Sequence, residues 1–162
     1  MRIPGFALVF LGLVGVMLFA PGAIAQSSPE RLALKGYDTV AYFTEQRAMP
    51  GNAQFQHEWD GAIYWFASAK HLELFKADPD RYLPQYNNWC AASVSRGEKV
   101  HGNPEWWLIT DRRLYLFGRP IGPGLMKSDP SMVNRADDNY SKVARLPAPP
   151  QPDYMRNTAK PQ

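Results

Sequence analysis

Two stretches of the chain alternate apolar and polar residues with the period of a β-strand. The first, residues 55–66, surrounds Asp60-Gly61, two residues that accept the positive φ angles of a two-residue type I′ turn. The second, residues 106–117, surrounds a turn near Asp111-Arg112. The pattern therefore predicts two β-hairpins.

The turn at Asp60-Gly61 also fixes the expected register of the first hairpin. Residues equally distant from such a turn lie opposite each other, and alternate side chains share a face. The expected facing pairs are Trp59 with Ala62, His57 with Tyr64, and Phe55 with Phe66. We expect Trp59 and Phe66 to point into the core.

Helix signals lie between and after the hairpins. Ser68 is a suitable N-cap for a helix that Asp78-Pro79 ends. A second short helix is expected to start with Asn87 or Asn88 as its N-cap and to end at Gly97, which places Cys90 in its first turn.

A last helix is expected over residues 131–143. Hairpins and short helices in this order predict a small single α+β domain of antiparallel hairpins packed with helices, and not a parallel sheet with crossovers. Reading along the chain reveals no internal repeat.

The two ends of the chain are expected to lie outside this domain. Arg2, the apolar run of residues 6–19 and the small residues before Gln26 are typical of a secretory signal peptide, residues 1–25. The alternative is a retained anchor, but about 14 apolar residues fall short of the roughly 20 in a spanning helix. Residues 146–162 are Pro-rich and predicted to be a disordered tail, which leaves residues 32–143 as the domain.

Charge and cysteine content exclude some functions. A net charge of +3 over 162 residues is too small to indicate nucleic-acid binding. Cys90 is the only cysteine, so an intramolecular disulfide is excluded although an exported protein would permit one. We expect a periplasmic or secreted protein without membrane insertion after signal cleavage.

An ordered set of motifs resembles the exported YHS-domain family. The matching residues are Gly36-Tyr37-Asp38-Thr39-Val40-Ala41-Tyr42-Phe43, Trp59-Asp60-Gly61, Tyr64, Phe66, Ser68, His71, Phe75, Asp78-Pro79, Tyr82, Pro84-Gln85-Tyr86, Cys90-Ala91 and Ala136-Asp137. The resemblance implies a YHS-like domain over residues 32–143. It also implies metal binding, which other YHS domains are suspected of achieving with a cysteine pair, whereas this chain has one cysteine.

The candidate metal ligands are Cys90, His57, His71 and His101. Thiolate and imidazole suit copper or zinc, and a composite site of Cys90 with a histidine and Met126 or Met132 would suit Cu(I). No two histidines have the spacing of a metal motif. The alternative interpretation is structural: His57 packs near Tyr64, His71 braces the first helix and His101 is exposed.

Cys90 and Asp38 can each be interpreted as a structural residue or as a reactive one. A thiol in the first turn of a helix would be reactive, whereas burial beside Trp89 and Ala91 would make Cys90 a structural residue, which we expect. Asp38 is expected to cap a turn with its own backbone. No pair of carboxylates and no Ser-His pair has a catalytic spacing.

We expect a binding or accessory protein rather than an enzyme. Its ligand would be a metal, with copper first, or a small molecule, and its partner is an unidentified periplasmic one. The alternatives are a protein-interaction domain without a ligand and a thiol-dependent redox enzyme that uses Cys90. The first alternative requires an exposed apolar patch, and the second an accessible thiol.

Overall fold

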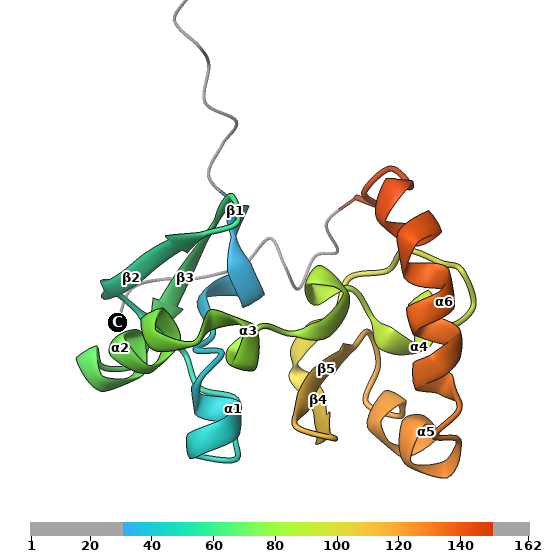
Figure 1. The fold of residues 1–162 in the computed structure, drawn as a ribbon, viewed down its shortest axis with the longest axis horizontal. Helices are drawn as coiled ribbons and strands as arrows, with labels where there is room; N and C mark the ends of the chain where they lie inside the picture. Colours follow the sequence, from blue (N-terminus) through green and yellow to red (C-terminus); the bar gives the residue numbers. More distant parts are fainter. Residues whose placement is uncertain (1–30, 151–162) are drawn as a thin grey trace, which may run out of the picture.

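The computed structural model describes residues 31–150. The predicted signal peptide and most of the predicted tail therefore lie outside the described residues. In chain order the elements are β1 (Arg31–Leu32), η1 (Ala33–Gly36), α1 (Ala41–Thr44), β2 (Asn52–Trp59), β3 (Ala62–Phe66), α2 (Ala69–Ala77), α3 (Pro79–Tyr82), η2 (Gln85–Asn88), α4 (Ala91–Val94), β4 (Asn103–Thr110), β5 (Arg113–Phe117), α5 (Gly122–Ser128) and α6 (Met132–Arg145) (Figure 1).

The strands form two small sheets, which confirms the α+β class. One sheet has the order β1-β3-β2, with β1 parallel to β3 and β2 antiparallel to it. The other is the antiparallel hairpin of β4 and β5. Figure 1 shows the first sheet among the helices α1 and α2, and the second sheet next to α4, α5 and α6.

The first hairpin turns where the sequence predicts. Asp60 and Gly61 have φ angles of 48° and 66°, as a type I′ turn requires. Trp59 faces Ala62, and His57 faces Tyr64, in agreement with the prediction.

Two details of the predicted first hairpin are wrong. A bulge between Asn52 and Gln56 shifts the register, so Phe66 lies opposite Asn52 and not opposite Phe55. Alternation along a sequence does not reveal where one strand gains extra residues. Phe66 is fully buried as predicted, but Trp59 is 38% exposed because it lies next to the hairpin turn.

The helices agree with the sequence in part. Ser68 caps α2, Asp78-Pro79 follows it, and Gly97 has a φ of 78° after α4, as predicted. The predicted N-cap at Asn87 or Asn88 is wrong, because both residues have left-handed φ angles of 52° and 69°. The helix α4 therefore begins at Ala91, and Cys90 precedes it as the N-cap residue.

The second half of the domain repeats the first, which corrects the expectation of no internal repeat. The strand pairs Asn52–Phe66 and His57–Tyr64 recur as Asn103–Phe117 and Leu108–Tyr115, each 51 residues later and with the bulge at the same place. Identical residues at this spacing from the hairpin onward include Gly51/Gly102, Asn52/Asn103, Asp60/Asp111, Tyr64/Tyr115, Phe66/Phe117, Leu74/Leu125, Lys76/Lys127, Asp78/Asp129 and Pro79/Pro130.

The repeat extends to the connections between elements. The parallel pairing of Leu32 with Ile63 recurs as a bridge between Pro84 and Leu114, and η1 recurs as η2. These earlier positions are 52 residues apart, not 51. We call residues 31–82 the first unit and residues 83–145 the second unit.

Each unit has its own hydrophobic core. Phe66 and Phe75 lie in the core of the first unit, whereas Phe117 and Met126, at the equivalent positions, lie in the core of the second. Leu114 of the second unit belongs to the first core and joins the two. The repeat therefore places two equivalent sites in one chain, each where a short helix begins beside the end of a hairpin.

Candidate functional site

In the first unit this place holds a buried carboxylate, that of Asp38. Its Oδ1 accepts hydrogen bonds from the N–H groups of Val40 at 2.8 Å and Ala41 at 3.3 Å, where α1 begins. Its Oδ2 accepts from the N–H of Ala67 at 2.7 Å, just after β3. Asp38 is 0% exposed, so these donors replace the water that a buried carboxylate loses. The prediction that Asp38 caps a turn is confirmed.

His71 occupies the space next to this carboxylate. Ser68 accepts the N–H of His71 at 3.2 Å, and this N-cap fixes the start of α2. The imidazole Nδ1 then lies 2.6 Å from Oδ2 of Asp38, and Nε2 lies 3.3 Å from Oγ1 of Thr44. His71 is buried, so the side chains of the first unit fill their own site.

Asp38, His71 and Thr44 also have the connectivity of a hydrolase triad. However, the Thr44 hydroxyl donates to the carbonyl of Val40 at 3.3 Å, and neither cavity described below includes Thr44. A nucleophile needs room for a substrate beside its oxygen. We therefore interpret the cluster as a brace between α1 and α2, as expected for His71.

Cys90 takes the place of Asp38 in the second unit. The N–H of Asp38 donates to Met49 O at 2.8 Å, and the N–H of Cys90 donates to Val100 O at the same distance. Cys90 is 5% exposed, which confirms the predicted burial, and its side chain makes no capping hydrogen bond to α4. The acceptor that Asp38 supplies in the first unit is thus missing here.

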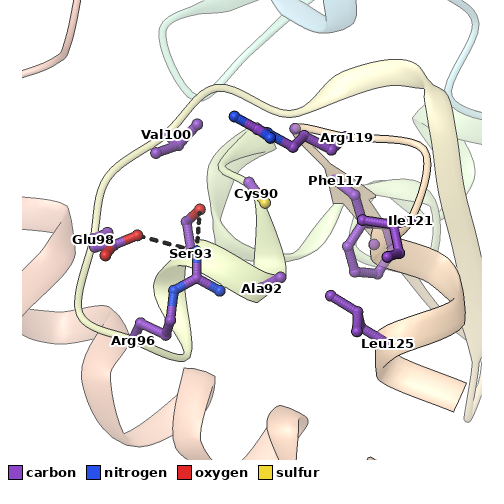
Figure 2. Close-up of a pocket in the computed structure, with 12 residues that line it drawn as sticks. Cys90, Ala92, Ser93, Arg96, Glu98, Val100, Phe117, Arg119, Ile121 and Leu125 are labelled. Atoms are coloured by element: carbon purple, nitrogen blue, oxygen red, sulfur yellow. Dashed lines mark hydrogen bonds and ion pairs between the residues drawn. The ribbon is translucent and has the colours of Figure 1, made fainter. Parts of the chain in front are cut away.

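A cavity of about 430 Å³ lies beside Cys90, as Figure 2 shows. Phe117, Ile121 and Leu125 form an apolar wall on one side of the Cys90 sulfur. Arg96 and Glu98 lie on the opposite side. The site therefore combines an apolar surface with charged groups, as small-molecule sites do.

The counterpart of His71 at this cavity has no side chain. This counterpart is Gly122, 51 residues later, which lines the cavity. A Cβ at Gly122 would lie 2.4 Å from Cβ of Phe117, so the backbone at this position admits only glycine. Ala67 corresponds to Gly118, which also lines the cavity. Gly122 therefore has no side chain at the position where the first unit has the imidazole of His71.

The charged groups at the cavity have a net positive charge. Arg96 lies 3.1 Å from the carboxylate of Glu98 and donates to Oγ of Ser93 at 3.3 Å. Arg119 is exposed, and its guanidinium has no hydrogen-bond or ion-pair partner within residues 31–150. One carboxylate and two guanidinium groups favour an anionic group on a ligand.

The remaining candidate ligands lie apart from this cavity. His57 is half-buried, and its ring centroid lies 6.2 Å from that of Phe75, as the packing interpretation expects. His101 is half-buried rather than exposed, because it packs on Trp89 at 4.8 Å and its Nε2 lies 3.2 Å from Pro149 O. Neither histidine lines the cavity with Cys90.

The candidate metal ligands are therefore dispersed. In residues 31–150, no group of three or more His, Cys, Asp or Glu residues could hold a metal ion. Cys90 does share a core with Met126 and Met132, the two methionines that the sequence suggested as soft ligands.

Comparison with known proteins adds no family to this picture. No family model, curated protein or solved structure matches the chain. The resemblance to exported YHS domains therefore stays a prediction. Within the described part of the chain, no helix has the length and apolar character needed to cross a bilayer.

A second cavity of about 300 Å³ lies between the two units. Its walls include Lys35 of the first unit, Trp89 of the second and Pro149 of the chain that follows α6. The buried Oδ1 of Asn88 is the one side-chain polar atom within residues 31–150 that is buried without a hydrogen-bond partner. Because the chain's own Pro149 forms part of this cavity, the cavity beside Cys90 is the better ligand site.

Sequence reasoning missed most of this site. It named Cys90 but not Arg96, Arg119, Gly118 or Gly122. The signal that would have found the two glycines is the repeat, since aligning the units places them opposite Ala67 and His71. The two arginines have no such signal, because surface arginines are common.

Proposed function

We propose that this chain is an exported binding module that takes a small organic ligand into the cavity beside Cys90. The observation that carries the proposal is the cavity itself, whose volume of about 430 Å³ falls within the roughly 300–1,000 Å³ typical of ligand pockets. Its apolar wall and its arginines suit a ligand with an apolar body and a polar end. Export rests on the predicted signal peptide, residues 1–25.

Copper is the second ligand to test. The observation that favours it is the common core of Cys90, Met126 and Met132, because thiolate and thioether sulfur are the ligands that Cu(I) prefers. A metal there would have to use sulfur ligands or groups brought by another molecule. The organic ligand is preferred because the cavity needs no rearrangement to admit it.

The protein-interaction alternative has one supporting feature. Ile121 is 62% exposed and Leu125 is 40% exposed, and both lie at the cavity. A partner would then cover the same surface through which a small ligand enters. The experiment on the cavity therefore also bears on this alternative.

Ligand-observed NMR with a mixture of small neutral, cationic and anionic fragments tests the proposal. We expect fragments to bind the wild-type protein and Lys127→Trp, whose substitution lies on α5 outside the cavity. Leu125→Trp should lose binding because the indole narrows the cavity. Absence of binding, or equal binding to both Trp variants, would overturn the proposal.

The same variants separate the alternatives. Stoichiometric Cu(I) binding that Cys90→Ser abolishes, without fragment binding, would replace the organic ligand with copper. We expect Cys90→Ser to bind the fragments as the wild type does, because the cavity walls stay in place.

A further inference from the structure

The segment that follows α6 is rich in proline, and it turns from the end of this helix toward the first unit (Figure 1). Its sequence is Leu146-Pro147-Ala148-Pro149-Pro150, and Ala148 and Pro149 form part of the wall of the second cavity. Leu146 has a φ of −64° and a ψ of 148°, close to the polyproline II values of about −75° and 145°. A residue before proline is restricted to such extended angles, so the sequence of the segment itself favours this conformation.

The second unit supplies hydrogen-bond donors to the carbonyl oxygens of this segment. Nζ of Lys99 donates to Ala144 O at 2.9 Å, at the end of α6, and also to Leu146 O. Nε2 of His101 lies 3.2 Å from Pro149 O, and because a carbonyl only accepts, this nitrogen carries the proton and donates. Proline has a carbonyl but no N–H. Walls that offer donors therefore match a proline-rich segment.

The indole of Trp89 contacts both of these donor side chains. Nζ of Lys99 lies 5.0 Å from the centre of the Trp89 ring, a cation–π distance. The ring centroids of Trp89 and His101 are 4.8 Å apart, and a β-bridge joins the two residues. Trp89 and His101 both line the second cavity with Pro149. An aromatic surface with donors fixed beside it is the arrangement that recognises polyproline II segments.

We propose that the second cavity is a recognition site for extended proline-rich peptides, and that the chain's own residues 146–150 occupy it in the free protein. Among the described residues, this site shares no wall residue with the cavity beside Cys90, and it does not depend on the proposed function. About 300 Å³ stays open beside Ala148 and Pro149, so the chain's own segment fills the site only in part. A proline-rich segment of another protein has to displace residues 146–150 before it binds.

The first test measures whether the segment is docked in solution, from the heteronuclear NOE of the 15N-labelled, full-length mature protein. In the wild type we expect the value at Ala148 to match the values along α6. It should fall in Lys99→Met, which loses the donor to Leu146. Lys142→Met, at an exposed position of α6, is the matched control and should behave as the wild type does. A flexible Ala148 in the wild type would overturn the proposal.

The second test supplies the segment from outside, as a peptide with the sequence of residues 146–152 and blocked ends. The full-length tail variant, Pro147→Gly/Pro149→Gly/Pro150→Gly, loses the stiffness that prolines give to its own segment. We expect the peptide to bind this variant saturably and to shift the indole N–H signal of Trp89. The wild type should bind it at least about tenfold more weakly, because a tethered segment competes at an effective concentration of about 1 mM.

A peptide with the same three glycine replacements is the control for the tail variant, and it should not bind. If the tail variant does not fold, the milder Pro149→Gly takes its place in the same titration. Equal affinity of the proline-rich peptide for the wild type and the variant would overturn the proposal, as would no binding to the variant. Neither result changes the expected binding of fragments beside Cys90.

Discussion

The two units of this protein have the same hairpin, the same bulge and the same short helix. They differ in the residues at the place where this helix begins beside the end of the hairpin. The first unit has Asp38 and His71 there, joined at 2.6 Å and both buried. The second has Cys90 and Gly122, and a cavity of about 430 Å³. One repeat therefore uses the site for stability, and the other leaves it available to a ligand.

The comparison also shows how few residue differences separate the filled site of the first unit from the open site of the second. A carboxylate that satisfies three N–H groups is replaced by a thiol that caps none of them. An imidazole is replaced by a glycine that Phe117 prevents from gaining a side chain. In the second unit the N–H groups of Ala92 and Gly118 therefore have no acceptor within residues 31–150.

The largest expected effect is on stability. Asp38→Ala should lower the free energy of unfolding by about 3–5 kcal/mol, because it leaves His71 and three N–H groups without their acceptor. The equivalent change, Cys90→Ala, should cost about 1 kcal/mol, since it removes one sulfur atom next to an existing cavity. Urea denaturation of both variants measures the difference. Equal losses would contradict the assignment of different roles to the two units.

The hairpin turns provide a smaller test of the repeat. Gly61 and its counterpart Arg112 both have positive φ, 66° and 60°. Gly61→Val should cost at least about 1 kcal/mol because a β-branched residue resists this conformation, whereas Gly61→Asn should cost less than half as much. A Cβ at Gly61 meets no atom within 4 Å, so thermal unfolding would report the backbone strain alone. An unchanged thermal stability of Gly61→Val would contradict the positive φ angle at position 61.

Replacing the thiol by a hydroxyl separates structure from binding in the second unit. Cys90→Ser should lower the free energy of unfolding by about 1 kcal/mol, because a more polar group enters a buried position. Fragment affinity should change less than twofold, because the walls of the cavity stay in place. Chemical denaturation and an NMR titration of the same variant give the two values. A large loss of affinity with unchanged stability would make Cys90 a functional residue.

The smallest expected effect concerns the link between the units. The Tyr37 hydroxyl of the first unit donates to Glu105 of the second, and burial, followed by this carboxylate, raises the pKa of Tyr37 to about 12. An unfolded tyrosine titrates near about 10. The stability from this group is therefore complete below about pH 10 and is lost as the pH rises toward 12. The stability of Tyr37→Phe should depend less on pH over that range, and an identical dependence would contradict this link.

Local signals predicted the parts of the fold that depend on neighbouring residues. Asp60-Gly61 gave the turn, Ser68 the N-cap, and Gly97 the end of the short helix, because each acts through its own backbone or within a few residues. The bulge in β2 and the left-handed residues of η2 were not predicted. Asn87 and Asn88 suit both an N-cap and a left-handed position, and only the bridge of Trp89 to His101 that follows decides between them.

The site was less predictable because it depends on residues far apart in the chain. Cys90 and Gly122 are 32 positions apart, and Asp38 and His71 are 33 apart. The repeat would have linked these pairs, but its spacing changes from 52 to 51 residues and most of its positions differ in residue type. Charge was no better a guide, since Arg119 resembles any surface arginine.

Hydrogen exchange at two equivalent amides tests the central claim most directly. In the protein without ligand, the N–H of Ala67, bound to Asp38 at 2.7 Å, should exchange at least about tenfold more slowly than that of Gly118, as the loss of one buried hydrogen bond implies. A fragment that binds in the cavity should slow exchange at Gly118, which lines it, and leave Ala67 unchanged. Slow exchange at Gly118 without ligand, or no response to a bound fragment, would contradict the account of an open site in the second unit.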